Sequence, residues 1–288
     1  MHLSALHIYP VKSCRGLSVP SAELDDHGFI GDRRFMVVAE ADGLFLTQRS
    51  HPRMALIETT LTNDSLVLSS PNHGSVTVPR NAFASHAGAG TNPGDRSSGT
   101  TGRPRRVTVW KSTVTADDCG DEPAEWLSEF LGLPLRLVRM GGTYQRPNLK
   151  AAAQAGDVVS FADACPFLVI GEASLADLND RLVAKNEDAL PMNRFRPNLV
   201  VAGCEAYAED AWTRIRIGGA IFRNAGPCAR CPITTTDQLT AVRGKEPLRT
   251  LATYRRDPAD PTDVNFGTNL IHETKRGRIE VGARIDLP

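Results

Sequence analysis

The sequence lacks a long apolar run, an excess of charge of either sign, and a signal for export. No apolar stretch approaches the roughly 20 residues that a membrane-spanning helix needs. The opening "MHLSALHIYPVKSC" lacks the basic segment and apolar core of a secretory signal. Lysine and arginine total 33, as do aspartate and glutamate, so no net charge attracts the chain to nucleic acid or to a membrane surface. We therefore expect a soluble, cytoplasmic protein that binds neither nucleic acid nor membrane.

Cysteine is also scarce, with six in 288 residues. Four of them, Cys14, Cys119, Cys165 and Cys204, are widely scattered, which suits a reducing compartment better than a disulfide framework. The other two lie close together in "NAGPCARCPITTTDQ", as Cys228 and Cys231. This pair is the first candidate for chemistry.

The first hundred residues predict short strands joined by turns. "RRFMVVAEADGLFLTQR" and "ALIETTLTNDSLVLSS" each hold two strand-like runs around a turn, at Asp42-Gly43 and Asn63-Asp64. "SVTVP" and "RRVTVW" are further strand candidates. Between them, residues 84–104 are rich in Gly, Ser, Thr and Pro, a composition typical of a disordered insertion.

The rest of the chain mixes strands with a few helices. "DEPAEWLSEFLGLP", "SLADLNDRLV" and "EPLRTLATYRR" carry apolar residues at helical spacing, and "TRIRIGGAIFR" predicts a hairpin at Gly218-Gly219. Many short strands with few helices predict a β-rich α+β fold, a barrel or sandwich with helices packed on it. We place a smaller β-rich domain at residues 1–120 and the second domain at residues 121–288.

The cysteine pair has three interpretations from its residues alone. A structural zinc site needs four ligands, and no second pair of cysteines or suitably spaced histidines stands near this one in sequence. A thiol switch needs a helix after the first cysteine, whereas "CPITTTD" is rich in β-branched residues and favours an extended chain. Two buried small hydrophobes are the third possibility, although Gly226-Pro227 and Arg230 indicate an exposed turn.

Cationic residues recur where predicted strands end. "YPVKSCRG" offers Lys12 with Ser13, "GDRRF" offers two arginines, and "NRFRPN" offers Arg194 and Arg196. Each alone is typical of a solvated surface. Together with a reactive thiol they predict a site for an anionic, phosphate-bearing cofactor whose other end is held by sulfur.

With these motifs, the chain resembles MOSC-domain proteins of the two-part type, in which a β-barrel-like N-terminal domain precedes the MOSC domain. The mitochondrial amidoxime reducing component is one such protein. The resemblance runs from Tyr9 to about Leu251 and covers most of the chain. It is carried by "YPVKSCRG", "DRRF", "DCGDEPAEWLSEFL", "PFLVIGEASLADLN", "FRPNLVVAGCEAYAEDAW", "CARCPITTTD" and "GKEPLRTL".

The resemblance implies a pterin-based molybdenum cofactor with a cysteine ligand to the metal. By position this ligand, and the catalytic residue, is Cys231. The residues that it implies for cofactor binding are Lys12, Ser13, Arg34, Asp163, Arg196, Asn198, Arg230 and Thr234. Two departures are Ala241, where relatives have glycine in a turn, and Ala164-Cys165, where hydroxyl-bearing residues are expected.

The implied reaction is the two-electron reduction of an N-hydroxylated small molecule, such as an amidoxime, a hydroxylamine or an N-hydroxylated base. The chain lacks the cysteine run of a ferredoxin domain, so a separate ferredoxin- or cytochrome b-type protein with its reductase is the expected electron donor. An alternative is a module that carries the molybdenum cofactor or sulfur, with a persulfide on Cys231. A general thiol-redox protein that uses Cys228 and Cys231 is a third hypothesis.

Overall fold

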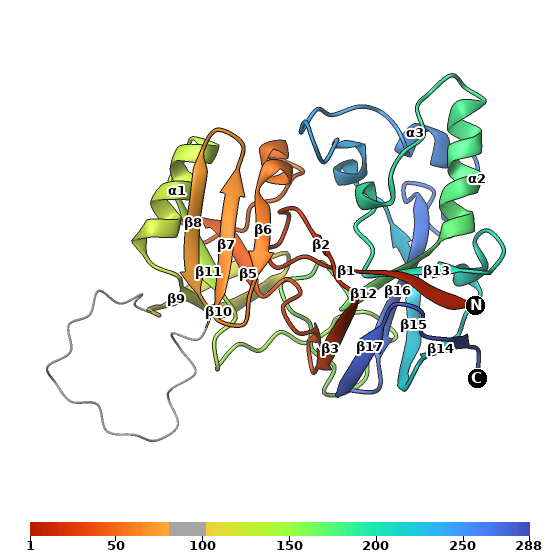
Figure 1. Ribbon diagram of the computed structural model, residues 1–288, viewed down its shortest axis with the longest axis horizontal. Helices are drawn as coiled ribbons and strands as arrows, with labels where there is room; N and C mark the ends of the chain where they lie inside the picture. The colour runs from red at the N-terminus through yellow and green to blue at the C-terminus, as the bar shows by residue number, and fades with distance from the viewer. Residues whose placement is uncertain (81–101) are drawn as a thin grey trace, which may run out of the picture.

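The structure is a computed structural model that describes residues 1–80 and 102–288. It has two strand-rich lobes that lie side by side (Figure 1). Strands greatly outnumber helices among the described residues and the sheets are curled, so the predicted β-rich α+β fold class is confirmed.

The larger lobe is built on a mixed sheet in the order β18-β14-β15-β16-β12-β13-β1-β2. Its strands are β1 (His2–Ile8), β2 (Leu17–Ser18), β12 (Phe167–Gly171), β13 (Leu199–Ala202), β14 (Arg214–Ile217), β15 (Ala220–Ala229), β16 (Asn265–His272) and β18 (Ile285–Asp286). A small sheet adds β3 (Ser21–Asp25), β4 (Gly28–Phe29) and β17 (Gly277–Glu280). The helical segments are α2 (Glu172–Val183), α3 (Leu248–Leu251), η2 (Met192–Arg194), η3 (Ala208–Asp210) and η4 (Pro232–Thr235). Helix α2 buries Leu178 and Leu182 against β12 and β13.

The smaller lobe combines two sheets and one longer helix. The first sheet has the order β5-β11-β10-β9 and the second β6-β7-β8. Its elements are β5 (Phe35–Ala39), η1 (Pro52–Leu56), β6 (Glu58–Leu61), β7 (Ser65–Ser70), β8 (Gly74–Pro79), β9 (Pro104–Val109), β10 (Ser112–Asp118), α1 (Asp121–Leu131) and β11 (Leu135–Arg139). Helix α1 contributes Trp126, Leu127 and Phe130 to a core shared with both sheets. Gly132, with φ 77°, ends it in the left-handed conformation that glycine favours.

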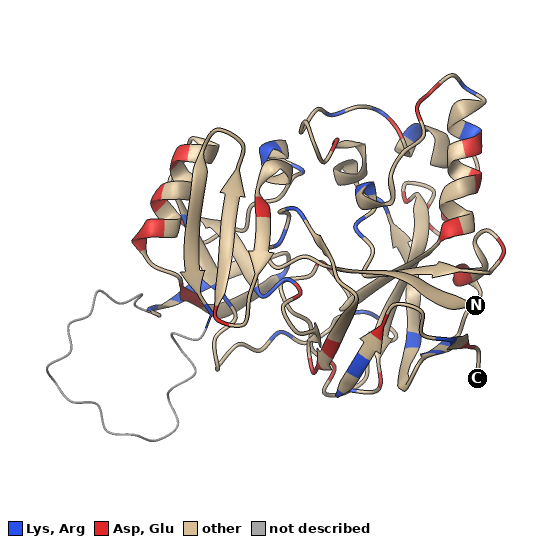
Figure 2. Ribbon diagram, in the orientation of Figure 1, with Lys and Arg blue, Asp and Glu red and all other residues tan. Residues whose placement is uncertain are grey.

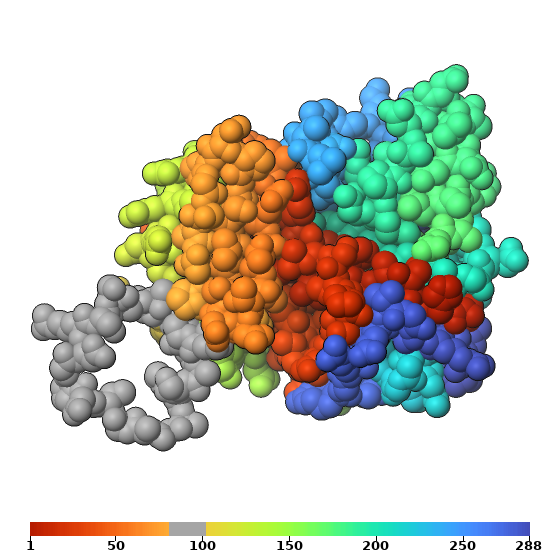
Figure 3. Space-filling model, viewed as in Figure 1, coloured from red at the N-terminus to blue at the C-terminus, as the bar shows by residue number. Residues whose placement is uncertain are grey.

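The two lobes do not follow the order of the chain. Strand β1 belongs to the sheet of the larger lobe, where His2 pairs with Ala202 and Leu3 with Val201 of β13. Strand β3 pairs with β17, near the other end of the sequence. Figure 3 shows this N-terminal segment lying between the two lobes. In turn, α1 and β11, which we assigned by sequence to the second domain, pack in the smaller lobe.

Most of the expected elements are confirmed. The turns at Asn63-Asp64 and Gly218-Gly219 join paired strands, β6 to β7 and β14 to β15. The segment "EPLRTLATYRR" gives only the single turn of α3, where Thr253 Oγ1 donates to the carbonyl of Thr250 and competes with further helical bonding. The expected insertion at residues 84–104 lies outside the described residues up to position 101, and Pro104 already begins β9.

Charge is spread over both lobes, in keeping with the balanced composition. Figure 2 shows acidic positions along α1 and α2 and basic positions where the lobes meet. In the described part of the chain, no helix has the length and hydropathy that a membrane span requires.

Candidate functional site

A cavity of about 520 Å³ lies where loops of the two lobes meet. The smaller lobe contributes the segment that holds Arg49 and the hairpin tip between β9 and β10, and the larger lobe contributes the loops before β12 and β13 and the end of β15. Seven of the residues expected at the site line this cavity: Lys12, Ser13, Asp163, Arg196, Asn198, Arg230 and Cys231.

Cys231 is a half-buried free thiol just beyond the end of β15. Its own backbone is extended, as expected before a proline, with φ −116° and ψ 173°. The residues after it form the 3₁₀ turn η4, so the expectation of an extended "CPITTTD" was wrong. Two threonine hydroxyls hold that turn: Thr234 Oγ1 donates to Cys231 O at 3.0 Å and Thr235 Oγ1 to Pro232 O at 2.8 Å.

Thr234 itself lies behind this turn, fully buried, and is not among the residues that line the cavity. Its hydroxyl holds the backbone of Cys231. The structure therefore places Thr234 as a support for the thiol-bearing residue rather than at the cavity wall.

Cys228 is the second free thiol at the cavity. Arg230 reaches this cysteine, since Nη1 donates to Cys228 Sγ at 2.9 Å and Nη2 donates to Phe195 O at 2.7 Å. The guanidinium inside the Cys-x-x-Cys thus contacts the first sulfur.

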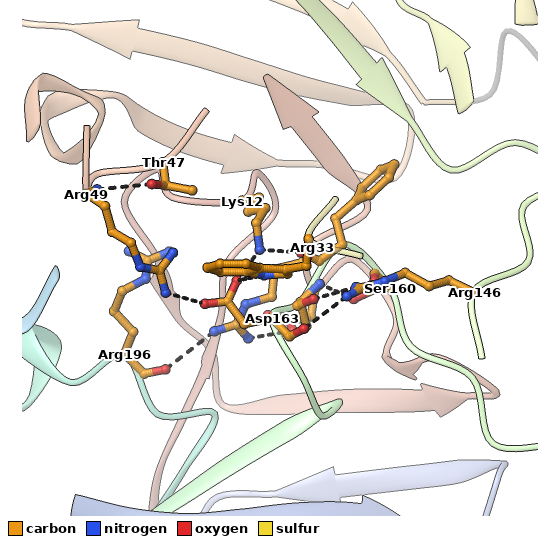
Figure 4. Close-up of polar contacts among 12 residues, drawn as sticks. Lys12, Arg33, Thr47, Arg49, Arg146, Ser160, Asp163 and Arg196 are labelled. Atoms are coloured by element: carbon orange, nitrogen blue, oxygen red, sulfur yellow. Dashed lines mark hydrogen bonds and ion pairs between the residues drawn. The ribbon is translucent and has the colours of Figure 1, made fainter. Parts of the chain in front are cut away.

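Asp163 is the centre of a polar network on one side of the cavity (Figure 4). Lys12 Nζ donates to its carboxylate and, at 2.8 Å, to the carbonyl of Phe161. Arg49 Nη2 donates to Asp163 Oδ2 at 2.9 Å and Trp110 Nε1 to Oδ1 at 3.1 Å. One carboxylate therefore fixes three donors, two of them from the N-terminal 50 residues and one from the β9–β10 tip.

Arg146 holds the backbone on which this network rests. Its guanidinium donates to the carbonyls of Ser160, Ala162 and Asp163 at 2.8, 2.6 and 3.0 Å (Figure 4). Because three carbonyls of one loop converge on a single buried cation, the loop that carries Asp163 has a defined shape.

Burial and neighbouring charge shift the pKa values of Lys12, Asp163 and Arg49, and these values decide the charge that the cavity presents to an anion. Burial lowers the pKa of Lys12 to about 8, and the attraction of Asp163 opposes it only in part. Burial would raise the pKa of Asp163, but Lys12 and Arg49 outweigh it and hold that pKa well below its usual range. For Arg49, burial acts to lower the pKa, but Asp163 and then Cys231 raise it. Arg49 is therefore the cation that faces both the carboxylate and the thiol of Cys231.

A second cationic group stacks around Tyr9. The guanidinium carbons of Arg33 and Arg196 lie 4.4 and 4.3 Å from the centre of its ring. Arg33 Nη1 is paired with Asp32 at 2.7 Å and with Asn198 Oδ1 at 2.9 Å. Arg196 is only 9 % exposed, and no carboxylate of the described residues forms an ion pair with it. Its charge is thus free to bind an anion in the cavity.

Asn198 is placed at the cavity, but both ends of its amide are used by the protein. Oδ1 accepts from Arg33 and Nδ2 donates to His7 O at 3.1 Å. This residue orients Arg33 toward the cavity wall.

Comparison with known proteins matches two family models to successive parts of the chain. Residues 1–134 match the MOSC N-terminal beta barrel domain and residues 156–286 match the MOSC domain. The mitochondrial amidoxime-reducing component 1 of Mus musculus is 37% identical over 90% of this chain and 73% of its own length. The human protein of the same name is 35% identical over 99% of this chain and 82% of its own. The chain belongs to the amidoxime-reducing component family of MOSC-domain proteins.

A longer relative shares the same two parts. The molybdenum cofactor sulfurase of Danio rerio is 33% identical over 95% of this chain, which corresponds to 32% of the sulfurase. This MOSC-domain protein thus spans one part of the sulfurase and most of the amidoxime-reducing components. The match to the N-terminal model extends to residue 134 and so includes α1, beyond the boundary that we predicted at residue 120.

Four residues of this MOSC-domain protein share an unusual backbone at the cavity. Ser13, Arg33, Trp110 and Arg196 have φ values of 67°, 48°, 54° and 56°, in the left-handed region that non-glycine residues rarely adopt. Such conformations persist where the surrounding structure enforces them, and they gather at functional sites. This observation marks the same cavity as the charge and thiol pattern does.

Besides Thr234, a second expected residue does not line the cavity. Arg34 turns away from the cavity, donating from Nη2 to Asp25 Oδ1 at 2.6 Å and to Phe29 O at 3.0 Å. Its neighbour Arg33 takes the place at the wall. Sequence reasoning offered both arginines of "DRRF" but chose the wrong one for the cavity.

Sequence reasoning also missed Arg49, Trp110 and Arg146. Arg49 is the last residue of the strand-like segment "LFLTQR". It thus lies at a predicted strand end, as Lys12 and Arg196 do. Trp110 and Arg146 carried no such signal, because only the fold brings a hairpin tip and a distant loop beside Asp163.

The donors at the cavity fit a cofactor that brings its own ligands to the metal. Among the described residues, no three His, Cys, Asp or Glu side chains cluster as a protein-only metal site would require. The thiol of Cys231, with the free charge of Arg196 and the buried Lys12 in the same cavity, instead matches a large anionic group that needs a single protein sulfur.

Proposed function

We propose that this protein binds a pterin-based molybdenum cofactor in the cavity and reduces N-hydroxylated small molecules, with Cys231 as the ligand to molybdenum. The observation that supports this most directly is the buried guanidinium of Arg196, which has no counter-ion in the described structure and opens into the same cavity as the thiol of Cys231. A buried charge without a partner is costly, so it indicates an anion that binds there.

Each side chain at the cavity has a role in this proposal. Arg196, with Arg33 beside it on Tyr9, would hold the phosphate of the cofactor through charge-assisted hydrogen bonds. Lys12 and the strained backbone of Ser13 would bound the pterin. Arg49 lines the cavity with Cys231 and would offset the negative charge of a sulfur bound to a soft metal.

The overall reaction consumes two electrons and two protons for each N–O bond broken, and an amidoxime yields an amidine and water. The cofactor, when bound, supplies the two-electron redox chemistry. The protein confines the substrate in a cavity lined on one side by fixed cations and holds a proton on Lys12 Nζ at neutral pH. We propose that the electrons come from a separate ferredoxin- or cytochrome b-type protein with its reductase. A cytoplasmic location stays a prediction.

The test compares the two cysteines. Cys231→Ala should lose molybdenum and all reduction of benzamidoxime with an artificial electron donor, while Cys228→Ala should keep molybdenum. Metal analysis of freshly purified protein and the formation of benzamidine are the measurements. Retention of molybdenum by Cys231→Ala would show that the ligand assignment is wrong.

A second candidate is a carrier of the molybdenum cofactor or of sulfur. It is supported by the match between 95% of this chain and 32% of the length of the Danio rerio molybdenum cofactor sulfurase. In that case mass spectrometry should find a persulfide on Cys231, and the purified protein should reduce no N-hydroxylated compound.

A further inference from the structure

The tip of the β9–β10 hairpin carries a tryptophan that the proposed reaction does not yet explain. Val109 pairs with Ser112, so Trp110 and Lys111 form a two-residue turn. Trp110 takes φ 54° there, at a position where such turns favour glycine. A bulky side chain in this conformation costs about 1–2 kcal/mol, which indicates that the position needs the indole for another reason.

The indole is fixed to the reactive side of the cavity. Its Nε1 donates to Asp163 Oδ1 at 3.1 Å, and the guanidinium carbon of Arg49 lies 4.6 Å from its ring centre. Arg49 and Cys231 line the same cavity. The tryptophan is thus held by residues of the cavity that also contains the thiol proposed as the metal ligand.

Trp110 is fixed but not buried. It is 43 % exposed, and across the same cavity wall Leu149 is 73 % exposed, beside Pro147. What distinguishes these two exposed apolar side chains from others on the surface is that both line the cavity, where apolar groups commonly contact a bound ligand. Phe167, Leu168, Phe195 and Ile233 also line the cavity but are buried, so the exposed large apolar side chains of its lining are Trp110 and Leu149.

We propose that Trp110 is a substrate-specificity residue, which with Leu149 forms an apolar wall for the flat aromatic part of an N-hydroxylated substrate. The proposal deepens the proposed function and rests on it for the reaction, though not for binding. The N–O group would then point toward Cys231 while the ring packs on the indole. Substrates without a ring would gain nothing from this wall.

The test uses two substrates that differ in the ring, benzamidoxime and acetamidoxime. Trp110→Gly removes the indole and suits the positive φ of the turn, so the hairpin should still form. We expect the dissociation constant and KM for benzamidoxime to rise about fivefold, with both values for acetamidoxime and the molybdenum content unchanged. Trp110→Phe should keep most of the preference for the aromatic substrate. Leu44→Ala, an exposed apolar residue outside the cavity, should change neither substrate.

Other results would overturn the proposal. An equal loss for both substrates, no change for either, or a loss of molybdenum in Trp110→Gly would show that the residue supports the fold or the cofactor instead. If the wild-type protein binds neither compound, the wall does not exist. Should it bind both but reduce neither, the proposed function fails, while a binding loss confined to benzamidoxime would still support the role of Trp110.

Discussion

At the scale of single residues, the two arginines of "DRRF" show how a correct motif can point to the wrong side chain. Arg33 and Arg34 are adjacent just before β5, yet only Arg33 lines the cavity. The backbone of Arg33, at φ 48°, decides which arginine faces inward, and no propensity predicts that conformation for arginine. Lys12 and Arg196 were proposed because each borders a predicted strand end, whereas Asp163 and Cys231 were proposed from the family resemblance; the structure places all four at the cavity.

Arg196 and Arg34 form a matched pair for testing this difference. Arg196→Gln should weaken cofactor retention by about tenfold or more, because a charge-assisted hydrogen bond contributes roughly 1.5–3 kcal/mol. Arg34→Gln should leave retention unchanged and cost about 1 kcal/mol of stability, since Arg34 pairs with the partly exposed Asp25. Molybdenum content after dialysis and chemical denaturation are the measurements. Equal retention in the two variants would contradict the assignment of Arg196.

Lys12 predicts a pH dependence for the same property. Its pKa of about 8 lies below the ordinary 10.5, so the cavity loses a positive charge as the pH rises through about 8. Cofactor retention should therefore fall between pH 7 and pH 9. Lys12→Arg keeps its charge over that range, so its retention should not change with pH. Dialysis at stepped pH followed by metal analysis tests this, and parallel profiles for both proteins would rule Lys12 out as the cause.

At the scale of elements, hairpins were predictable and short helical turns were not. Strand pairs around Asn63-Asp64 and Gly218-Gly219 have local turn signals. The turn η4 depends instead on hydroxyl-to-carbonyl bonds from Thr234 and Thr235, which override the strand preference of β-branched residues. Helix α3 ends at Leu251, and the hydroxyl of Thr253 just beyond it donates to the carbonyl of Thr250.

The loop after η4 offers a test of backbone strain. We expected Ala241 to alter the turn in which relatives have glycine, yet it keeps a positive φ of 59°. Ala241→Gly should therefore stabilise the protein by about 0.5–1 kcal/mol, because glycine accepts this conformation without strain. Thermal unfolding with the bound cofactor removed is the measurement. A lower midpoint than that of the wild-type protein would mean that the turn is not strained.

At the scale of the whole molecule, the sequence indicated two β-rich parts. It did not indicate that the N-terminal strands β1 and β3 pack in the larger lobe. Periodicity shows that residues 2–8 form a strand, whereas the partner of that strand lies some 200 residues away and carries no local sign. The core of the larger lobe accordingly includes Leu3, Leu6 and Phe29 beside Phe167 and Phe222. A boundary drawn from composition alone separates residues that share one core.

The pairing of β1 with β13 predicts that the C-terminal part of the chain is insoluble without the N-terminal part. Residues 140–288 alone would leave the edge of β13 and the apolar residues beneath β1 uncovered. We expect that fragment to aggregate, and co-expression with residues 1–139 to restore a soluble complex. Sedimentation and circular dichroism of both preparations test this. A soluble, cooperatively unfolding fragment would show that β1 is dispensable.

The pairing of His2 with Ala202 also sets an order of events during synthesis. A ribosome adds about 5–20 residues each second, so the first strand emerges some 10–40 s before its partner exists. During that interval Leu3 and Leu6, both buried in the finished protein, lack their partners on β13. The nascent chain is thus a natural client for a chaperone that captures short apolar segments, and its yield in cells should depend on one.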